Sequence, residues 1–508
     1  QDQKGRNGVE RKRTPGVREI GGVVKIRSRK LDRLTPWLVV IGLIVGTMPL
    51  AQSAQTKPSP RKPNIVFILG DDLGYCDVSM YGCREIPTPN IDSIAADGVR
   101  FTNGYVTAPV CSPSRAGLMT GRYQQRFGFE FNAGPLPRAL ADPEMGLPAS
   151  EITLAEVMKK TGYATGMVGK WHLGMHPKFQ PTQRGFDEYF GFLFGANMYI
   201  DPDQPGVKSA DPEGVGVRIR SRRNPIMRNQ TPVEETDYLT EAFAREAVAF
   251  IERHRNEPFF LYAPFNAPHT PLQATKKYLD RFPQIKDERR QIYAAMVSAL
   301  DDAVGAILNK LRDAKLDRDT LVVFLSDNGC ATYTKACTND PLRLGKLTHF
   351  EGGFRVPFAM RLPGVVKAGT VYDEAISSLD LFPTAIALAG QKLPADRQYD
   401  GVDLLPFLTG RAKTSPHEIL CWRNGENAAI RKGKWKMFRA ADHFWLYDLS
   451  SDPGEQKNLA GKHPDIVEQL KEELAKWEAG MKQPLWPCRL TGDQFRPVID
   501  GVKLNLCI

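Results

Sequence analysis

The most constraining feature of this 508-residue chain is a set of four apolar runs, each of which ends in polar side chains. None of the runs alternates polar and apolar residues, as is typical of strands buried on both faces of a parallel sheet. The runs occupy 64–72, 163–174, 258–271 and 320–329. Helical patterns lie at 153–162, 237–254 and 289–314. This strand–helix alternation predicts a doubly wound α/β sheet.

The polar ends of these runs predict one common site. Taken singly, each has an ordinary structural explanation, such as a turn, a helix cap or a histidine with satisfied hydrogen bonds. In open α/β sheets, however, ligands gather beyond the carboxyl ends of the strands. The residues concerned are Asp71, Asp72, Lys170, His172, His269, Asp327 and Asn328. Three carboxylates and an amide oxygen suit Ca²⁺ or Mg²⁺, and basic side chains beside such a cation suit an anionic ligand.

Cys111 opens the stretch "CSPSRAGLMTGRY", which has the pattern of a helix N-terminus. We expect Ser112 to cap this helix and Pro113 to lie in its first turn. Cys111 would then lie where backbone N–H groups favour anions. A cysteine-phosphatase nucleophile would need an arginine six residues later, but position 117 is glycine. A disulfide or an inert buried thiol remains an alternative at this point.

The positive charge of the chain is concentrated near its beginning. Residues 1–34 carry a net charge of +7 within a total of +10, which argues against nucleic acid as a partner. An uncharged apolar run at 37–50 and small residues up to Ala54 follow, as in a signal peptide. The run is short for a membrane span, although an uncleaved anchor is the alternative. We expect export to the periplasm or the extracellular space, without stable membrane insertion after cleavage.

Eight cysteines suit an exported protein but do not define a disulfide framework in a chain of this length. Two pairs are close enough in sequence to form local disulfides: Cys330 with Cys337, and Cys76 with Cys83. The cysteine spacings do not repeat as C-x-x-C, so a structural zinc site is not expected.

The motif C-S-P-S-R at 111–115, followed by T-G-R at 120–122, resembles the signature of the type I sulfatases. This formylglycine-dependent family is related to alkaline phosphatase. The resemblance also covers "PNIVFILGDDLGYCDVSMYG", "MVGKWHLG", "NAPHTP", "SDNG", "GKLTHFEGGFRVP" and "LYDLSSDPGEQKNLA". It extends from about Pro63 to Trp486, which is essentially all of the expected mature chain.

The resemblance implies that a formylglycine-generating enzyme oxidises Cys111 to Cα-formylglycine. One hydroxyl of the hydrated aldehyde would attack sulfur, and the other would expel inorganic sulfate. The family's metal ligands correspond to Asp71, Asp72, Asp327 and Asn328, with Ca²⁺ or Mg²⁺ as the cation. Arg115 would hold the hydrate, and Lys170 and Lys346 would neutralise sulfate oxygens. His172 would take a proton during release, and His269 would protonate the departing alcohol, either alone or together with Lys346.

The expected fold is a large mixed, mostly parallel sheet sandwiched by helices, like that of alkaline phosphatase. A smaller C-terminal antiparallel sheet with a helix would follow it. Polar–aromatic alternation at 433–460 predicts the short strands, and a helix at 464–481 would place Ile466, Leu470, Leu474 and Trp477 on one face. We therefore divide the chain into a leader and signal peptide (1–56), a catalytic domain (57–414) and a C-terminal α+β subdomain (415–508).

The leading functional hypothesis is hydrolysis of sulfate monoesters on a sulfated carbohydrate. Residues 195–235 are predicted to be a long excursion outside the core, and its arginines (Arg218, Arg220, Arg222 and Arg223) either contact an anionic polymer or are simply solvated. Trp171 and Trp422 either stack on a sugar or, as we favour, pack in the core. The alternatives are an aryl sulfate substrate, a phosphonate monoester or phosphodiester hydrolase using the same aldehyde, and a catalytically silent glycan-binding protein.

Overall fold

The computed structural model describes residues 62–210 and 223–508. The predicted leader and signal peptide, as well as Arg218, Arg220 and Arg222, lie outside the described residues. The described residues belong to one compact unit.

The main sheet has ten strands in the order β13-β2-β12-β11-β1-β9-β4-β5-β7-β8. Its five central strands pair in parallel, and they are β11 (Thr320–Ser326), β1 (Asn64–Gly70), β9 (Phe259–Pro264), β4 (Ala164–Lys170) and β5 (Glu188–Phe192). The flanking strands are β13 (Thr370–Tyr372), β2 (Val99–Phe101), β12 (Phe358–Arg361), β7 (Ile226–Arg228) and β8 (Thr231–Val233). The four apolar runs therefore form four neighbouring strands at the centre of the sheet, as predicted.

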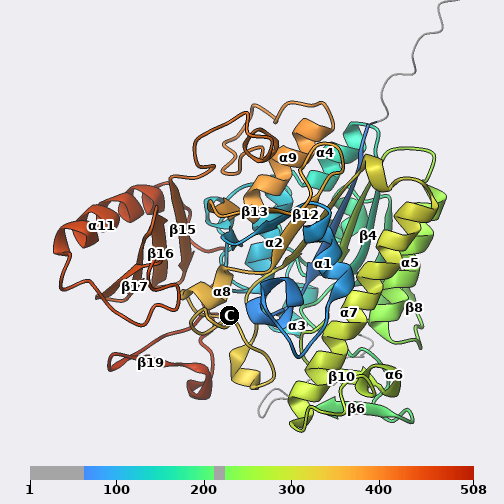
Figure 1. Cartoon of the computed structure of the whole chain (residues 1–508), viewed down its shortest axis with the longest axis horizontal. Coiled ribbons are helices and arrows are strands. Elements are labelled where there is room, and N and C mark those ends of the chain that lie inside the picture. Colours follow the sequence, from blue (N-terminus) through green and yellow to red (C-terminus); the bar gives the residue numbers. More distant parts are fainter. Residues whose placement is uncertain (1–61, 211–222) are drawn as a thin grey trace, which may run out of the picture. The chain divides into compact units, whose positions relative to one another are not determined.

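Both faces of this sheet are covered by helices (Figure 1). Alternate residues of β1 belong to different core clusters: Phe67 packs in a cluster with α2 and α9, whereas Ile68 packs with α5 and α7. This is why the strands are apolar throughout. The helices of the first face are α2 (Cys111–Thr120), α4 (Leu154–Lys160) and α9 (Leu381–Leu388). Those of the second are α1 (Pro89–Ala96), α5 (Leu239–Arg253) and α7 (Glu288–Asp313).

Helix α7 is the longest of the described helices, and it contains the predicted apolar pattern. Among the described residues, it is also the one helix that is long and apolar enough to cross a membrane. Its side chains explain this composition, because Ile292, Met296, Leu300 and Val304 are all fully buried against the sheet and its neighbouring helices. Helix α7 is therefore a core helix.

A separate four-stranded antiparallel sheet follows in the C-terminal part. Its strands are β15 (Ile419–Asn424), β16 (Asn427–Lys432), β17 (Trp435–Ala440) and β18 (His443–Asp448). Helix α11 (Pro464–Ala479) packs on it through the buried Leu470 and Leu474, while Ile466 and Trp477 are partly buried at the same cluster. The predicted antiparallel sheet and helix are confirmed, whereas the domain boundary near Ser415 stays a prediction.

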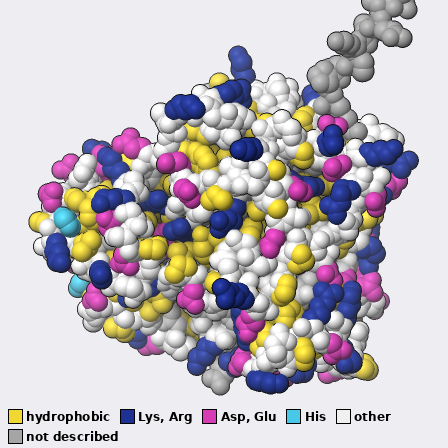
Figure 2. All heavy atoms as spheres, in the orientation of Figure 1, with side chains coloured by type: hydrophobic (Ala, Val, Ile, Leu, Met, Phe, Trp, Pro, Cys, Tyr) yellow, Lys and Arg dark blue, Asp and Glu magenta, His cyan; other side chains and the backbone are white. Residues whose placement is uncertain are grey.

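Shorter elements complete the described fold. The helices are α3 (Leu136–Ala141), α6 (Lys276–Leu279), α8 (Glu351–Phe354) and α10 (Leu405–Leu408). Three two-stranded pairs are β10 (Leu272–Thr275) with β6 (Val207–Ala210), β14 (Ile376–Ser377) with β3 (Gly104–Tyr105), and β19 (Val498–Ile499) with β20 (Val502–Lys503). On the face in Figure 2, lysines and arginines are interspersed with acidic side chains, so positive charge does not gather there.

Three sequence-based expectations need correction or a choice between alternatives. Residues 195–235 are not wholly an excursion, because β7 and β8 extend the main sheet and Tyr199 is fully buried. Cys76 and Cys83 are free thiols, whereas Cys330 and Cys337 form the predicted disulfide. The core-packing alternative for the tryptophans is correct, since Trp171 and Trp422 are buried.

Candidate active site

The predicted site residues come together at the carboxyl edge of the parallel strands. Asp71 follows β1 directly, Asp327 follows β11 directly, and Lys170 is the last residue of β4. His172 lies two residues beyond β4, and His269 lies in the loop that follows β9. Because β11, β1, β9 and β4 are adjacent and parallel, the ends of all four strands meet at one edge.

Four oxygen-bearing side chains form the acidic part of the site: Asp71, Asp72, Asp327 and Asn328 are all buried. Asn328 donates from Nδ2 to Asp72 Oδ1 at 2.7 Å. This leaves Asn328 Oδ1 without a hydrogen-bond partner, and Asp71 Oδ1 is also buried and without one among the described residues. Buried oxygens normally have a partner, so these two are available to a further ligand. An all-oxygen donor set of this kind fits a hard divalent cation such as Ca²⁺ or Mg²⁺.

Three buried cationic side chains surround these carboxylates. Arg115 donates from Nε to Asp327 Oδ2 at 2.8 Å and from Nη1 to the Lys170 carbonyl oxygen at 2.7 Å. Lys170 Nζ lies 2.5 Å from Asp71 Oδ2. Lys346 Nζ lies 2.8 Å from Asp72 Oδ2. Three positive groups thus face three negative groups, and every one of them is held by a direct ion pair.

Cys111 is the first residue of α2, which differs from the sequence prediction that Ser112 caps the helix. The N-cap position is Val110, and the Ser112 hydroxyl instead donates to the carbonyl oxygen of His172. The Ser112 N–H donates to Asn132 Oδ1 at 3.1 Å, and Cys111 Sγ lies 3.9 Å from the same oxygen. The cysteine is therefore held at a helix N-terminus beside the end of β4.

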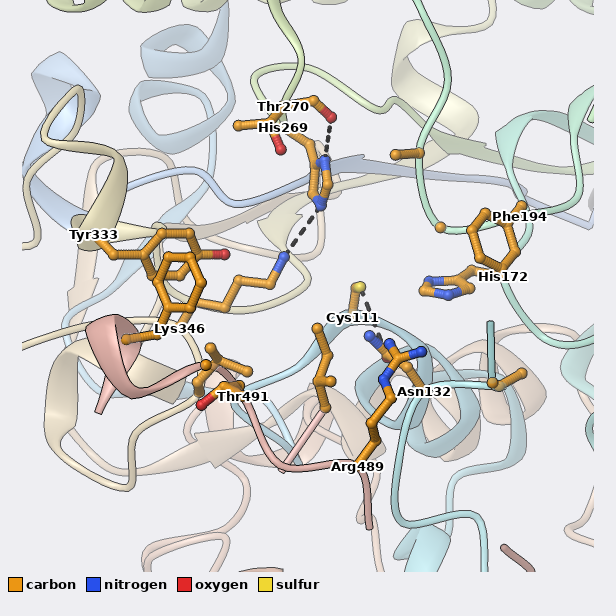
Figure 3. A pocket seen from close by; sticks show the side chains of 18 of the residues that line it. Cys111, Asn132, His172, Phe194, His269, Thr270, Tyr333, Lys346, Arg489 and Thr491 are labelled. Atoms are coloured by element: carbon orange, nitrogen blue, oxygen red, sulfur yellow. Dashed lines mark hydrogen bonds between the residues drawn. The ribbon is translucent and has the colours of Figure 1, made fainter. Parts of the chain in front are cut away.

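Cys111, His172, His269 and Lys346 all line one pocket of about 370 Å³ (Figure 3). His269 Nε2 lies 3.1 Å from Lys346 Nζ, while its Nδ1 lies 2.6 Å from the Thr270 carbonyl oxygen. The His172 ring lies on the other side of Cys111, and its buried Nδ1 has no hydrogen-bond partner. Gly195 packs against this ring, where an added Cβ would lie only 2.7 Å from Cε1.

The crowding of charges and the burial of the site shift the pKa values of its groups. Burial and the nearby Asp327 carboxylate raise the pKa of Asp71 to about 7, despite the opposing effect of Lys170 and Arg115. Burial also raises the pKa of Asp72, but Lys346 and His269 outweigh it and hold that pKa at about 2. These shifts show that the carboxylates differ strongly in their electrostatic environment.

The pKa values of the basic groups and of the thiol shift for the same reasons. Burial and the neighbouring Lys170 lower the pKa of His172, while burial and Lys346 lower that of His269. Burial lowers the pKa of Lys346 too, but the Asp72 carboxylate raises it further, so the ammonium form is favoured. Burial raises the pKa of the Cys111 thiol, so this cysteine is not a thiolate nucleophile of the low-pKa kind.

The structure brings all ten predicted residues into this one region, and it adds others that the sequence did not reveal. Asn132 touches Cys111, but it follows no strand and belongs to no recognisable motif. Phe194 lines the pocket from the loop after β5, and Tyr333 lines it from a short 3-10 helix (Thr332–Thr334). Arg489 and Phe495 reach it from the C-terminal segment, and the only signal was a nearby cysteine, Cys488, whose partner the sequence could not identify.

Comparison with known proteins shows a family relationship along most of the chain. The family model described as "Sulfatase" matches residues 63–391. The chain belongs to the sulfatase family. It is therefore a sulfuric ester hydrolase of the type I sulfatases in the alkaline phosphatase superfamily. A second model, described as "N-sulphoglucosamine sulphohydrolase, C-terminal", matches residues 344–480 of this sulfatase.

Named relatives support the assignment. The sulfatase is 38% identical over 400 residues to N-acetylgalactosamine-6-sulfatase of Sus scrofa, covering 77% of this chain and 73% of that protein. It is 30% identical over 518 residues to N-acetylgalactosamine-6-O-sulfatase of Bacteroides thetaiotaomicron, covering 88% of this chain and 99% of that protein. Among solved structures, Ps i-CgsB in complex with k-i-k-neocarrahexaose is similar, with a TM-score of 0.76, 37% identity, and coverage of 84% of this chain and 95% of that one.

Proposed function

We propose that this sulfatase hydrolyses sulfate monoesters on sulfated carbohydrates and releases inorganic sulfate. The observation that carries the proposal is the position of Cys111 at a helix N-terminus, where its Sγ lies within 4.8 Å of a carboxylate oxygen of Asp71 and of Asp327. These belong to the cluster in which three carboxylates pair with three cations. Relatives named for N-acetylgalactosamine sulfate and a similar structure in complex with k-i-k-neocarrahexaose support a carbohydrate substrate.

The proposed nucleophile is Cα-formylglycine, formed from Cys111 by a formylglycine-generating enzyme. The hydrated aldehyde supplies two hydroxyls on one carbon, one for attack on sulfur and one for release of sulfate without a second water molecule. The position of the residue supports this role, because the N–H groups at the start of α2 favour the negative charge of a sulfate beside it. Arg115, buried behind Cys111, would hold the hydrate while it keeps Asp327 and Asp71 in place.

Asp71, Asp72, Asp327 and Asn328 would hold a divalent cation, which we propose to be Ca²⁺. The two buried oxygens without partners, Asp71 Oδ1 and Asn328 Oδ1, support this assignment. When bound, the cation would polarise the sulfate group and lower the pKa of the attacking hydroxyl. Lys346 and Lys170 each already bond one of these carboxylates, which keeps both ammonium groups beside the position of the sulfate oxygens.

Two histidines are placed for proton transfer at different steps. His269 Nε2 faces the pocket beside Lys346 Nζ, and we propose that this pair delivers a proton to the departing alcohol oxygen. His172 lies on the opposite side of Cys111 and has a free ring nitrogen. We propose that it removes the proton of the second hydroxyl when sulfate is released. Because these two groups lie on different sides of residue 111, they need not compete for one proton.

We propose further that the protein is exported and acts in the periplasm or outside the cell. A substrate of glycan size would be available there, and the apolar run at 37–50 with its basic leader supports a signal peptide.

The test is sulfate release from a panel of sulfated monosaccharides and oligosaccharides, with the protein co-expressed with a formylglycine-generating enzyme. Cys111→Ala and a phosphodiester substrate are the controls. The proposal predicts release from at least one sugar position by the wild type and none by the variant. Diester cleavage that depends on Cys111, without any release of sulfate, would favour the phosphodiester or phosphonate hydrolase instead.

A further inference from the structure

One wall of the pocket above Cys111 consists of residues that lie beyond both family models, which end at residues 391 and 480. This wall is formed by Arg489, Leu490, Thr491, Gly492, Phe495 and Ile508. We propose that Arg489 determines substrate specificity by binding a second anionic group of the substrate, next to the sulfate that is removed. The inference rests on the proposed function and names a narrower class of substrate, a sugar with two anionic groups.

Covalent and hydrogen bonds within the C-terminal segment hold its backbone in place. Cys488 and Cys507 form a disulfide that closes the segment on itself. Backbone hydrogen bonds join Thr491 N to the Leu506 oxygen at 2.9 Å and Ile508 N to the Arg489 oxygen at 3.0 Å. The backbone of Arg489 is therefore fixed by bonds at and next to this residue. A residue that recognises a substrate requires such a fixed position.

Packing fixes the same segment against the active site itself. Its apolar side chains Ile499, Leu504 and Leu506 are buried in one cluster with Val110 and Leu347, the neighbours of Cys111 and Lys346 in the chain. Phe495 also packs edge-on against Tyr333, with ring centroids 5.0 Å apart. The wall thus shares a hydrophobic core with the chain neighbours of Cys111 and Lys346, which holds the backbone of the wall close to these residues. The side chain of Arg489 itself is exposed.

The charge of Arg489 is available to a ligand. Among the residues that the structure describes, none forms a hydrogen bond or an ion pair with its guanidinium, which points into the pocket toward Cys111 and Asn132 (Figure 3). Arg115, Lys170 and Lys346 differ in this respect, because each is paired with a carboxylate. Among the described residues, no aspartate or glutamate side chain lines the pocket. Arg489 is therefore an additional positive charge in a concave site.

The chemistry of a guanidinium indicates what it binds. Its planar N–H groups pair in a bidentate manner with sulfate or carboxylate oxygens, and such charge-assisted bonds are stronger than bonds to neutral hydroxyls. Both anions occur on sugars, as a second sulfate ester or as the carboxylate of a uronic acid. Because Arg489 and the catalytic groups line the same pocket, the second anion would lie on the same sugar unit or on the adjacent one.

The test compares matched substrates that differ by one anionic group. One arm compares a monosulfated sugar with the same sugar bearing a second sulfate, and the other compares a neutral with a uronate-containing disaccharide, each carrying one scissile sulfate. The variants are Arg489→Gln, Arg489→Lys and the control Lys503→Gln, which removes an exposed cation of the same segment that pairs with Asp493 outside the pocket lining. The readout is a ratio: kcat/KM for the substrate with the second anionic group, divided by kcat/KM for its partner without that group.

We expect Arg489→Gln to lower this ratio by about 10- to 100-fold for the anion that Arg489 binds, mainly through KM, because the contact is made equally in the bound and the reacting substrate. Arg489→Lys should restore part of the loss, and Lys503→Gln should leave the ratio unchanged. The arm that responds identifies the second anion as a sulfate or a carboxylate. An unchanged ratio for Arg489→Gln in both arms would overturn the inference.

A binding measurement separates this inference from the proposed function. In a Cys111→Ala background, which cannot turn over, calorimetry would measure Kd for both members of each pair with and without Arg489→Gln. Weaker binding of only the dianionic ligand by the double variant supports Arg489 even if no sulfatase activity is found. An equal loss of affinity for both ligands, or no loss of affinity for either, would overturn the inference even if the wild type is an active sulfatase.

Discussion

Lys346 connects the acidic cluster to the pocket through its ion pair with Asp72 and its contact with His269. We predict that Lys346→Met lowers kcat by about 10²- to 10⁴-fold, since it removes both a charge beside the sulfate oxygens and a partner of the proposed proton donor. KM should change much less. Steady-state kinetics on any active sulfate ester would measure both parameters.

The control for this prediction is Lys335→Met, which alters an exposed lysine in the loop that also carries Tyr333. It should leave kcat within about twofold of the wild type, because surface changes away from a site are mostly neutral. Circular dichroism would verify that both variants are folded. Comparable losses in the two variants would show that Lys346 has no specific role.

The acidic cluster should bind Ca²⁺ in the absence of any substrate. We predict that millimolar Ca²⁺ raises the unfolding temperature of the wild type and that EDTA reverses the effect, because a ligand of the folded state alone stabilises it by about 2.7 kcal/mol at about 100 times Kd. Differential scanning calorimetry would measure it. Asp71→Asn keeps the size of the side chain, but removes a charge, and should abolish the response.

The matched control here is Asp403→Asn, since Asp403 accepts a hydrogen bond from Leu405 N and is not among the proposed ligands. This variant should keep the full response to Ca²⁺, whatever its own stability. If the unfolding temperature of the wild type does not change when Ca²⁺ is added, the proposed metal site is refuted.

At the scale of elements, a histidine–carboxylate pair links the loop before β15 to the start of α9. His417 Nε2 lies 2.8 Å from Asp380 Oδ1. Burial lowers the pKa of His417, but the Asp380 carboxylate, helped by Asp400, raises it further, and the net shift is upward. The pair therefore contributes stability that is complete below the unfolded pKa of about 6.5 and is lost as pH rises through the folded pKa.

We predict that the difference in free energy of unfolding between the wild type and His417→Gln is larger at about pH 6 than at about pH 9. Urea unfolding at the two pH values would measure it. His443→Gln, which changes an exposed histidine of β18, is the control and should show no such pH-dependent difference. A difference that grows with pH would contradict the assigned ion pair.

The main strands and helices could be predicted from the sequence because local pattern and tertiary environment agree in them. The strand β1, for example, is apolar throughout, and all seven of its residues are buried. The start of α2 could not be placed correctly, since the Ser112 hydroxyl bonds to the distant His172 carbonyl instead of capping its own helix. Strands β7 and β8 were missed because strands of only three residues have little periodicity of their own.

At the scale of the whole molecule, seven of the ten predicted site residues converge because strand ends gather at a single edge of the sheet. Cys111 and Arg115 join them from α2, and Lys346 joins them from a turn between β11 and α8. The grouping of the seven strand-end residues could be inferred from the topology, whereas Cys111, Arg115 and Lys346 were placed in the site by the family resemblance. The substrate-facing wall could not, because Arg489 and Phe495 reach the pocket through a disulfide and a shared core that no local pattern reveals. The part of the site nearest the chemistry was thus the more predictable part.

The most direct test of the account is mass spectrometry of the peptide that carries residue 111, in Cys111→Ser protein incubated with a sulfate ester that the wild type hydrolyses. A single hydroxyl can accept the sulfo group but has no second hydroxyl to expel it. A covalent mechanism through residue 111 predicts that this peptide gains one sulfo group (SO3), that the alcohol is released, and that the peptide stays sulfated. An unmodified peptide, with sulfation absent at every time of incubation, would contradict a covalent mechanism through residue 111.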